Sequence, residues 1–139
     1  MNKKIADLVH RDPVTLDCSQ SAYDAARLMR EHNIGDVVIT EGGTIKGIVT
    51  DRDIVVNCLA VEKDPKATPL REFCGSKIVS IGPSDSLNEA VKRMRQNSIR
   101  RLVVCDGNEL VGVVSLGALA VTMDPNSALG QISQAPANN

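Results

Sequence analysis

The chain has 139 residues, of which 42% are hydrophobic and 24% are charged, and its formal net charge is −1. This length predicts one domain, or two small halves that share a core. A near-neutral chain lacks the basic surface that binds nucleic acid or an anionic membrane. Its only aromatic residues are Tyr23 and Phe73, which disfavours base-stacking platforms. We see neither a signal peptide nor an apolar run of the roughly 18 residues that span a bilayer, and we expect a cytoplasmic protein.

The first predicted elements are a short extended stretch, PVTL at residues 13–16, and a helix. Ser21 followed by Asp24 has the spacing of a capping box, in which a serine hydroxyl and an acid each bind a backbone N–H of the first helical turn. Apolar residues then recur at helical spacing, which indicates one buried helix face. These residues are Ala22, Ala25, Ala26 and Met29.

Two strand-like runs follow, DVVIT at residues 36–40 and IKGIVT at 45–50. The loop between them contains Gly42 and Gly43, and glycine-bearing loops of this length form hairpins. A second helix is predicted to begin at Thr50. This part of the chain therefore has the order β-α-β-β-α.

A polar stretch with two prolines comes next, and Thr68 followed by Pro69 predicts an N-cap and first residue of a short helix that ends near Gly75.

A sequence shift of 65 residues aligns residues 14–50 with 79–115 without a gap and with eleven identities. The chain is therefore an internal duplication.

The second copy predicts an extended stretch at 77–81, a helix opened by Ser86 and Glu89, strands at 101–106 and 109–115, and a helix from Ser115. Glu is a better acid for a capping box than Asp, so the sequence favours this second box over the first. One or two helical turns are predicted after Asp124-Pro125.

We divide the chain into a first repeat (5–60), a linker (61–69), a second repeat (70–122) and a C-terminal tail (123–139). The fold class is α/β (α+β). We expect the two repeats to be related by a pseudo-twofold axis, with their sheets packed together and their helices outside.

The four cysteines, Cys18, Cys58, Cys74 and Cys105, form no CxxC pair, and we expect reduced and mostly buried thiols. His10 and His32 are far apart in sequence, and each is expected at the surface. No residue set has the spacing of a metal site or of a catalytic triad, zinc protease or P-loop, so neither a metal nor an enzymatic activity is predicted. A metal-linked or redox-linked protein using these cysteines stays as an alternative.

Tandem β-α-β-β-α units that each close with Gly-h-h-[Ser/Thr], where h is an apolar residue, resemble the cystathionine-β-synthase (CBS) domain pair, or Bateman module. The motifs that carry the resemblance are GTIKGIVTDRDI in the first unit and NELVGVVS in the second. The resemblance implies a non-catalytic regulatory module, such as an energy sensor. It would bind an adenosine-containing ligand (AMP, ADP, ATP or S-adenosylmethionine) between the repeats, form a homodimer and signal to an effector protein.

The chain departs from the family pattern at three positions. Many members carry proline where Val37 and Leu102 stand. The ligand motif Gly-h-h-[Thr/Ser]-x-x-Asp is complete in the first repeat at Thr50 and Asp53, but the second repeat has Ala118 in place of the acid. The resemblance implies that Asp53 binds ribose hydroxyls, and that the second cleft binds ribose poorly or differently.

Thr50 and Asp53 also have the spacing of a capping box, so a purely structural role is the alternative. Ser115 opens the equivalent helix without an acid, which favours a ligand role for Asp53. Arg52 adds charge at the same helix start. A dimeric scaffold with degenerate pockets, in which Thr50 and Asp53 only cap the helix, is the main rival function.

The resemblance implies further ligand contacts in both repeats. Arg100 and Arg101 stand where the first repeat has Gly35 and Asp36, and a guanidinium fork suits a phosphate; solvated charge is the alternative. Neighbouring strand residues point to opposite faces, so at most one arginine faces a given cleft. The remaining implied contacts are Thr15, Ile48, Ser80, Ser98 and Ile99.

Overall fold

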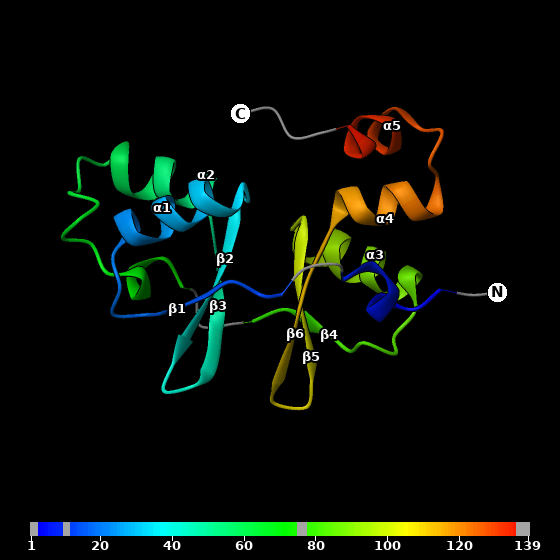
Figure 1. Ribbon diagram of the computed structural model, residues 1–139, viewed down its shortest axis with the longest axis horizontal. Helices are drawn as coiled ribbons and strands as arrows, with labels where there is room; N and C mark the ends of the chain where they lie inside the picture. Colours follow the sequence, from blue (N-terminus) through cyan, green and yellow to red (C-terminus); the bar gives the residue numbers. More distant parts are fainter. Residues whose placement is uncertain (1–2, 10–11, 75–77, 136–139) are drawn as a thin grey trace. The chain divides into compact units, whose positions relative to one another are not determined.

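The computed structural model describes residues 3–9, 12–74 and 78–135 (Figure 1). The chain forms two compact units. One is the continuous segment Pro13–Ile78, here called the first unit, and the other combines Met1–Asp12 with Val79–Asn139, here called the second unit. Each unit contains one of the two sequence repeats.

The first unit contains a three-stranded sheet in the order β1-β2-β3, in which β1 and β2 are parallel and β2 and β3 antiparallel. Helices α1 and α2 contribute apolar residues to the core on one face of this sheet (Figure 1). Its elements are β1 (Thr15–Asp17), α1 (Ala22–His32), β2 (Asp36–Glu41), β3 (Thr44–Thr50), α2 (Asp51–Ile54), a π-helical turn η2 (Val55–Leu59) and a 3-10 helix η3 (Leu70–Phe73).

The second unit repeats this sheet as β4-β5-β6 with the same strand directions. An additional helix, α5, packs on α4 (Figure 1). Its elements are a 3-10 helix η1 (Ile5–Leu8), β4 (Ser80–Ile81), α3 (Leu87–Asn97), β5 (Arg101–Asp106), β6 (Glu109–Ser115), α4 (Leu116–Met123) and α5 (Ala128–Gln134).

The 65-residue repeat holds in the details of the backbone. The β-bulge between Ile39 and Thr40 of β2 recurs between Val104 and Cys105 of β5. Helices α1 and α3 both end at a left-handed residue, Asn33 with φ 54° and Ser98 with φ 53°. These matches confirm the predicted duplication and the α+β fold class.

Each unit has its own apolar core, built from one face of its sheet and the helices that cover it. The buried residues of the first core are Cys18, Ala22, Ala25, Met29, Val37, Ile39, Val49, Ile54, Cys58 and Leu70. Those of the second are Ile5, Leu8, Ile81, Ala90, Met94, Leu102, Val104, Val114 and Leu119. Val37 and Ile39 of β2 are alternate residues, as are Leu102 and Val104 of β5, so each pair points to one face of its sheet.

The two capping boxes differ from the sequence expectation. Ser21 and Asp24 form both reciprocal bonds, with Asp24 N–H donating to Ser21 Oγ (3.1 Å) and Ser21 N–H to Asp24 Oδ2 (3.2 Å). Ser86 accepts from the N–H of Glu89 (3.1 Å), but the Glu89 carboxylate accepts from Arg93 Nε (2.9 Å) instead of completing the box. The prediction that favoured the second box was wrong because a charged partner one helical turn away competes for Glu89.

The segment after the polar stretch also corrects a prediction. Thr68 does not cap a helix, because its hydroxyl donates to the Asp64 carbonyl (2.7 Å) and the 3-10 turn η3 starts only after Pro69. The predicted helix end at Gly75 lies outside the described residues. The predicted helix in the tail is confirmed as α5.

The N-terminal segment packs with the second repeat. The N–H groups of Ile5 and Ala6 donate to the carbonyls of Asp85 (3.1 Å) and Pro83 (2.9 Å). Gly112 of β6 lies so close to the Val9 side chain that a Cβ at Gly112 would overlap it. Spatial grouping and chain order therefore differ at this end of the protein.

Candidate functional site

The start of α2 carries the complete capping box that the sequence predicted. Thr50 N–H donates to Asp53 Oδ2 (2.8 Å), and Asp53 N–H donates to Thr50 Oγ1 (3.2 Å). Asp53 is half-buried, whereas Asp51 and Arg52 are exposed. The cap therefore occupies one carboxylate oxygen of Asp53 and fixes where the second oxygen lies.

The equivalent helix of the second unit starts with half of this arrangement. Ser115 Oγ accepts from the N–H of Ala118 (3.1 Å), and no acid follows. Helix α4 nevertheless forms and continues to Met123. A hydroxyl cap alone is sufficient to start this helix.

The sheet of the first unit gathers four of the predicted site residues on one face. Thr15 of β1 is in register with Val38 of β2, which is in register with Ile48 of β3. Two residues away on β2, and so on the same face as Val38, Asp36 pairs with Thr50. Side chains in register share a face, and Val38 alternates with the core residues Val37 and Ile39, so this is the face opposite the helices.

The second unit repeats this placement with different chemistry. Ser80 is in register with Val103 and through it with Val113, and Arg101 pairs with Ser115. Asp36 and Arg101 thus occupy equivalent positions beside the two helix caps, but with opposite charge. Asp36 is 6% exposed and Arg101 is half-buried.

The other predicted residues have identifiable structural roles. The carbonyls of Gly35 and Arg100 accept from the N–H groups of Asp51 (3.0 Å) and Leu116 (2.8 Å), which joins each sheet to the following helix. Ser98 is the left-handed residue after α3, and Ile99 packs against the second core. The predicted residues are therefore divided between the two units.

Cys74 lies close to this site, and no sequence pattern predicts it. A Cβ built on Gly47 would be 3.8 Å from the Cys74 sulfur, whose thiol donates to the Leu70 carbonyl (3.6 Å). Burial raises the pKa of the Cys74 thiol, and the nearby Cys18 and Asp53 raise it further. Cys74 was missed because Cys74 and Asp53 are distant in sequence without a recognisable spacing.

Three of the four cysteines belong to the first core, where Cys18 and Cys58 are buried and Cys74 is partly buried. Burial also raises the pKa of Cys105 in the second unit. Within the described ranges, no three His, Cys, Asp or Glu side chains are grouped to hold a metal ion. His32 is exposed as predicted, and His10 lies outside the described residues.

In the part of the chain that the structure describes, every helix is too short or too polar to cross a bilayer.

The family model described as "CBS domain" matches residues 5–59 and again residues 70–124. The chain therefore belongs to the CBS-domain family and carries two CBS domains in tandem.

Individual relatives agree with this assignment. The CBS domain-containing protein YhcV of Bacillus subtilis is 39% identical over 91% of this chain and 89% of its own length. A solved structure described as a putative signal-transduction protein with CBS domains from Burkholderia ambifaria is 30% identical, with a TM-score of 0.82 over 90% of this chain and 96% of that chain.

Solved neighbours differ in what they bind and how they assemble. Hypoxic Response Protein I, with two coordinated zinc ions, is 28% identical (TM-score 0.74; 85% of this chain and 97% of that chain). CBS domain protein PAE2072 from Pyrobaculum aerophilum, complexed with AMP, is 23% identical and shares the fold (TM-score 0.76; 93% and 95%). A CBS-CP12 protein from bloom-forming cyanobacteria, 25% identical, is hexameric (TM-score 0.81; 90% and 74%).

Proposed function

We propose that this CBS pair is a non-catalytic regulatory module that binds an adenosine-containing nucleotide through Asp53. The ligand class is AMP, ADP, ATP or S-adenosylmethionine. Binding favours one arrangement of the protein by its differential affinity for the alternatives, and an effector protein responds to that arrangement.

The observation that carries this proposal is the difference between the two helix caps. Ser115 starts α4 with a hydroxyl alone, so the fold does not require an acid at this position. Asp53 is present in the first repeat, half-buried, with Oδ2 bound to the cap. A carboxylate has acceptor capacity for several donors, and ribose hydroxyls are suitable donors.

The surroundings of Asp53 support a ligand role. Ile48 and Thr15 provide an apolar and a hydroxyl surface on the neighbouring sheet face, suited to a base. The π-helical turn η2 directly follows α2, and such turns are frequent at functional sites. The phosphate and base contacts that the family resemblance implies for Arg101 and Ser80, with Ser98, Ile99 and Arg100 close by in sequence, remain predictions.

The AMP complex of PAE2072 concerns that protein, and it supports the proposal by showing that a protein of this fold holds an adenosine nucleotide.

We also propose a homodimer. Four apolar residues in and after η2, namely Val55, Val56, Leu59 and Val61, are between 39% and 55% exposed. Light scattering on the purified protein measures the mass directly, and a hexamer is the alternative outcome.

The test is a thermal-shift and calorimetric panel with AMP, ADP, ATP, S-adenosylmethionine and NADH on the wild type, Asp53→Ala and Asp24→Ala. Asp24 is a matched control because it forms the same capping box at α1 and is not a predicted ligand contact. A ligand at 100 times its Kd stabilises the fold by about 2.7 kcal/mol, which raises the Tm by several degrees.

We expect a shift with at least one adenosine ligand, retained in Asp24→Ala and lost in Asp53→Ala. Both variants should lose comparable stability without ligand, about 0.3–1 kcal/mol, because each loses a cap acid. If no ligand shifts the wild type, or if both variants respond alike, Asp53 is a cap and the protein is better described as a scaffold.

A further inference from the structure

Helix α5 covers the start of α4, the position in the second repeat that corresponds to the Asp53 site (Figure 1). A Cβ built on Gly117 would lie 2.9 Å from the Ser133 hydroxyl of α5 and 3.8 Å from the Ser115 hydroxyl that caps α4. Ser133 therefore lies directly beside the first turn of α4. The shift of 65 residues aligns Gly117 with Arg52, which is exposed in the first repeat.

The cover continues along α4 and distinguishes the two repeats. Residues 120–122 of α4 are half-buried, whereas their counterparts 55–57 are exposed. The chain after η2 runs instead to the start of α1, where the carbonyls of Thr68 and Pro65 accept from the first two N–H groups of that helix (2.9 and 3.1 Å). Within the described residues, a helix thus covers this position in the second repeat alone.

Two glycines allow α5 to approach α4 so closely. Gly117 has no side chain to hold Ser133 away, and Gly130 is the one buried residue of α5. A Cβ at Gly130 would overlap the Asp124 carbonyl oxygen and lie 3.1 Å from the backbone of Pro125. Because backbone atoms cannot give way as a flexible side chain does, a larger residue at Gly130 would push α5 off α4.

Helix α5 is nevertheless held by few apolar contacts. Its two large apolar residues, Leu129 and Ile132, are 43% and 72% exposed. No residue of α5 belongs to the apolar core of the second unit. Segments with few buried apolar contacts open at a low free-energy cost. Helix α5 can therefore leave α4 while the core beneath it stays folded.

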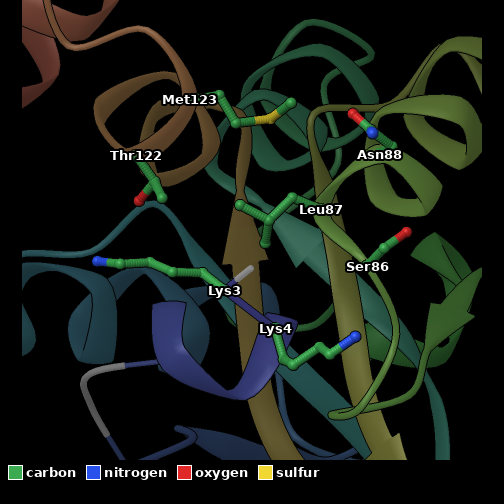
Figure 2. Close-up of a pocket in the computed structure, with 7 residues that line it drawn as sticks. All are labelled: Lys3, Lys4, Ser86, Leu87, Asn88, Thr122 and Met123. Carbon is green, nitrogen blue, oxygen red and sulfur yellow. The ribbon is translucent and has the colours of Figure 1, made fainter. Parts of the chain in front are cut away.

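This cover is distinct from the cavity of about 430 Å³ in the same unit. Thr122 and Met123, at the far end of α4, line that cavity (Figure 2). Its other lining residues belong to the N-terminal segment and to the start of α3. The contact with Ser133 lies at the opposite end of α4, next to Ser115.

We propose that α5 is a lid that closes the second repeat's counterpart of the Asp53 site. This inference rests on the proposed function, in which Asp53 binds an adenosine-containing nucleotide. Two differences then separate the second repeat from a nucleotide site. Ala118 supplies no carboxylate for ribose hydroxyls, and Ser133 lies beside the helix start at the position of the exposed Arg52. The chain therefore binds one nucleotide, and the second position opens only when α5 moves away and an acid is supplied.

The experiment examines the second position alone, in chains that carry Asp53→Ala. Ala118→Asp supplies the acid, and Gly130→Leu displaces α5. The probes are AMP, ADP, ATP and S-adenosylmethionine, titrated by calorimetry. We expect one nucleotide per chain when both changes are present. Binding should be about tenfold weaker or more when either change is missing, a difference typical of hydrogen bonds to one charged group.

A second route to displacement and a control accompany these variants. Gly117→Arg gives α4 the residue of the first repeat and pushes Ser133 away, so with Ala118→Asp it should also bind a nucleotide. Leu129→Ala shortens an exposed side chain of α5 and should leave the position closed. Hydrogen exchange checks the state of each variant, because displacement should remove protection from α5 while β5 and β6 keep theirs.

The outcomes separate the lid from the nucleotide proposal. Nucleotide binding to Ala118→Asp with α5 still protected would overturn the lid. The absence of binding when the acid is present and α5 is displaced would overturn it as well. Two nucleotides per wild-type chain would contradict the lid and leave the Asp53 site intact. A wild type that binds no nucleotide, beside a combined variant that binds one, would contradict the Asp53 site and support the lid.

Discussion

The two repeats start their last shared helix in the same way and then diverge. Both β3 and β6 end at a hydroxyl residue that accepts the N–H three residues on. After Thr50 the chain forms a four-residue α-helix and a π-helical turn, whereas after Ser115 it forms eight residues of regular α-helix. Features present in both copies are what the fold needs, and features of one copy are candidates for function.

The starts of α1 and α3 also differ between the two repeats. In the first repeat the linker carbonyls occupy the helix start, and in the second repeat a cavity with two lysines lies there. The first copy has an acid at the start of its last shared helix, Asp53, where the second copy has Ala118.

The largest expected effect tests whether the two cores are equivalent. Leu102→Ala removes a fully buried side chain from the second core and should cost about 2–5 kcal/mol. Its counterpart Val37→Ala should cost less, because valine has one side-chain carbon fewer. Urea denaturation followed by circular dichroism measures both. A loss below about 1 kcal/mol for Leu102→Ala would contradict the assigned core.

The shared caps give an intermediate effect. Ser21→Ala and Ser86→Ala each remove a hydroxyl that accepts one helical N–H, at 3.1 Å in both repeats. We expect each variant to lose about 1 kcal/mol of the free energy of unfolding. The same denaturation experiment, with Ser84→Ala as an exposed control outside the caps, measures this. A loss in either variant no larger than that of the control would show that its serine hydroxyl does not stabilise the helix start.

The smallest expected effect sharpens the contrast between Asp53 and Ala118. Ala118→Asp supplies the missing acid of the second box and should stabilise the protein by a few tenths of a kcal/mol, up to about 1. Thermal denaturation measures the gain. A clear loss of stability would mean that the packing of Ala118 against the second core excludes an acid.

Much of the local structure could be predicted from the sequence because its causes are local. Strands 101–106 and 109–115 match β5 and β6 from end to end, since alternation and a glycine turn define both hairpins. The duplication made each unit a check on the other. The starts of α1, α2, α3 and α4 followed from their cap residues.

The errors arose where a distant or competing group decides the structure. The Glu89 carboxylate accepts from Arg93 instead of completing its capping box, and the Thr68 hydroxyl donates to the Asp64 carbonyl instead of capping a helix. Neither the packing of Ile5 with the second repeat nor the proximity of Cys74 to Asp53 has a sequence signature, because the partners are separated by tens of residues. The ligand contacts assigned by family resemblance remain predictions.

The discontinuity of the second unit has a consequence for synthesis on the ribosome. The segment Pro13–Ile78 is continuous, so it can fold as soon as it has emerged. Ile5 and Leu8 emerge earlier, but their core partners in β6 and α4 are made near the end of the chain. At about 5–20 residues per second, these two buried side chains stay without their core for several seconds. These two residues can therefore complete their core only after most of the chain has been made.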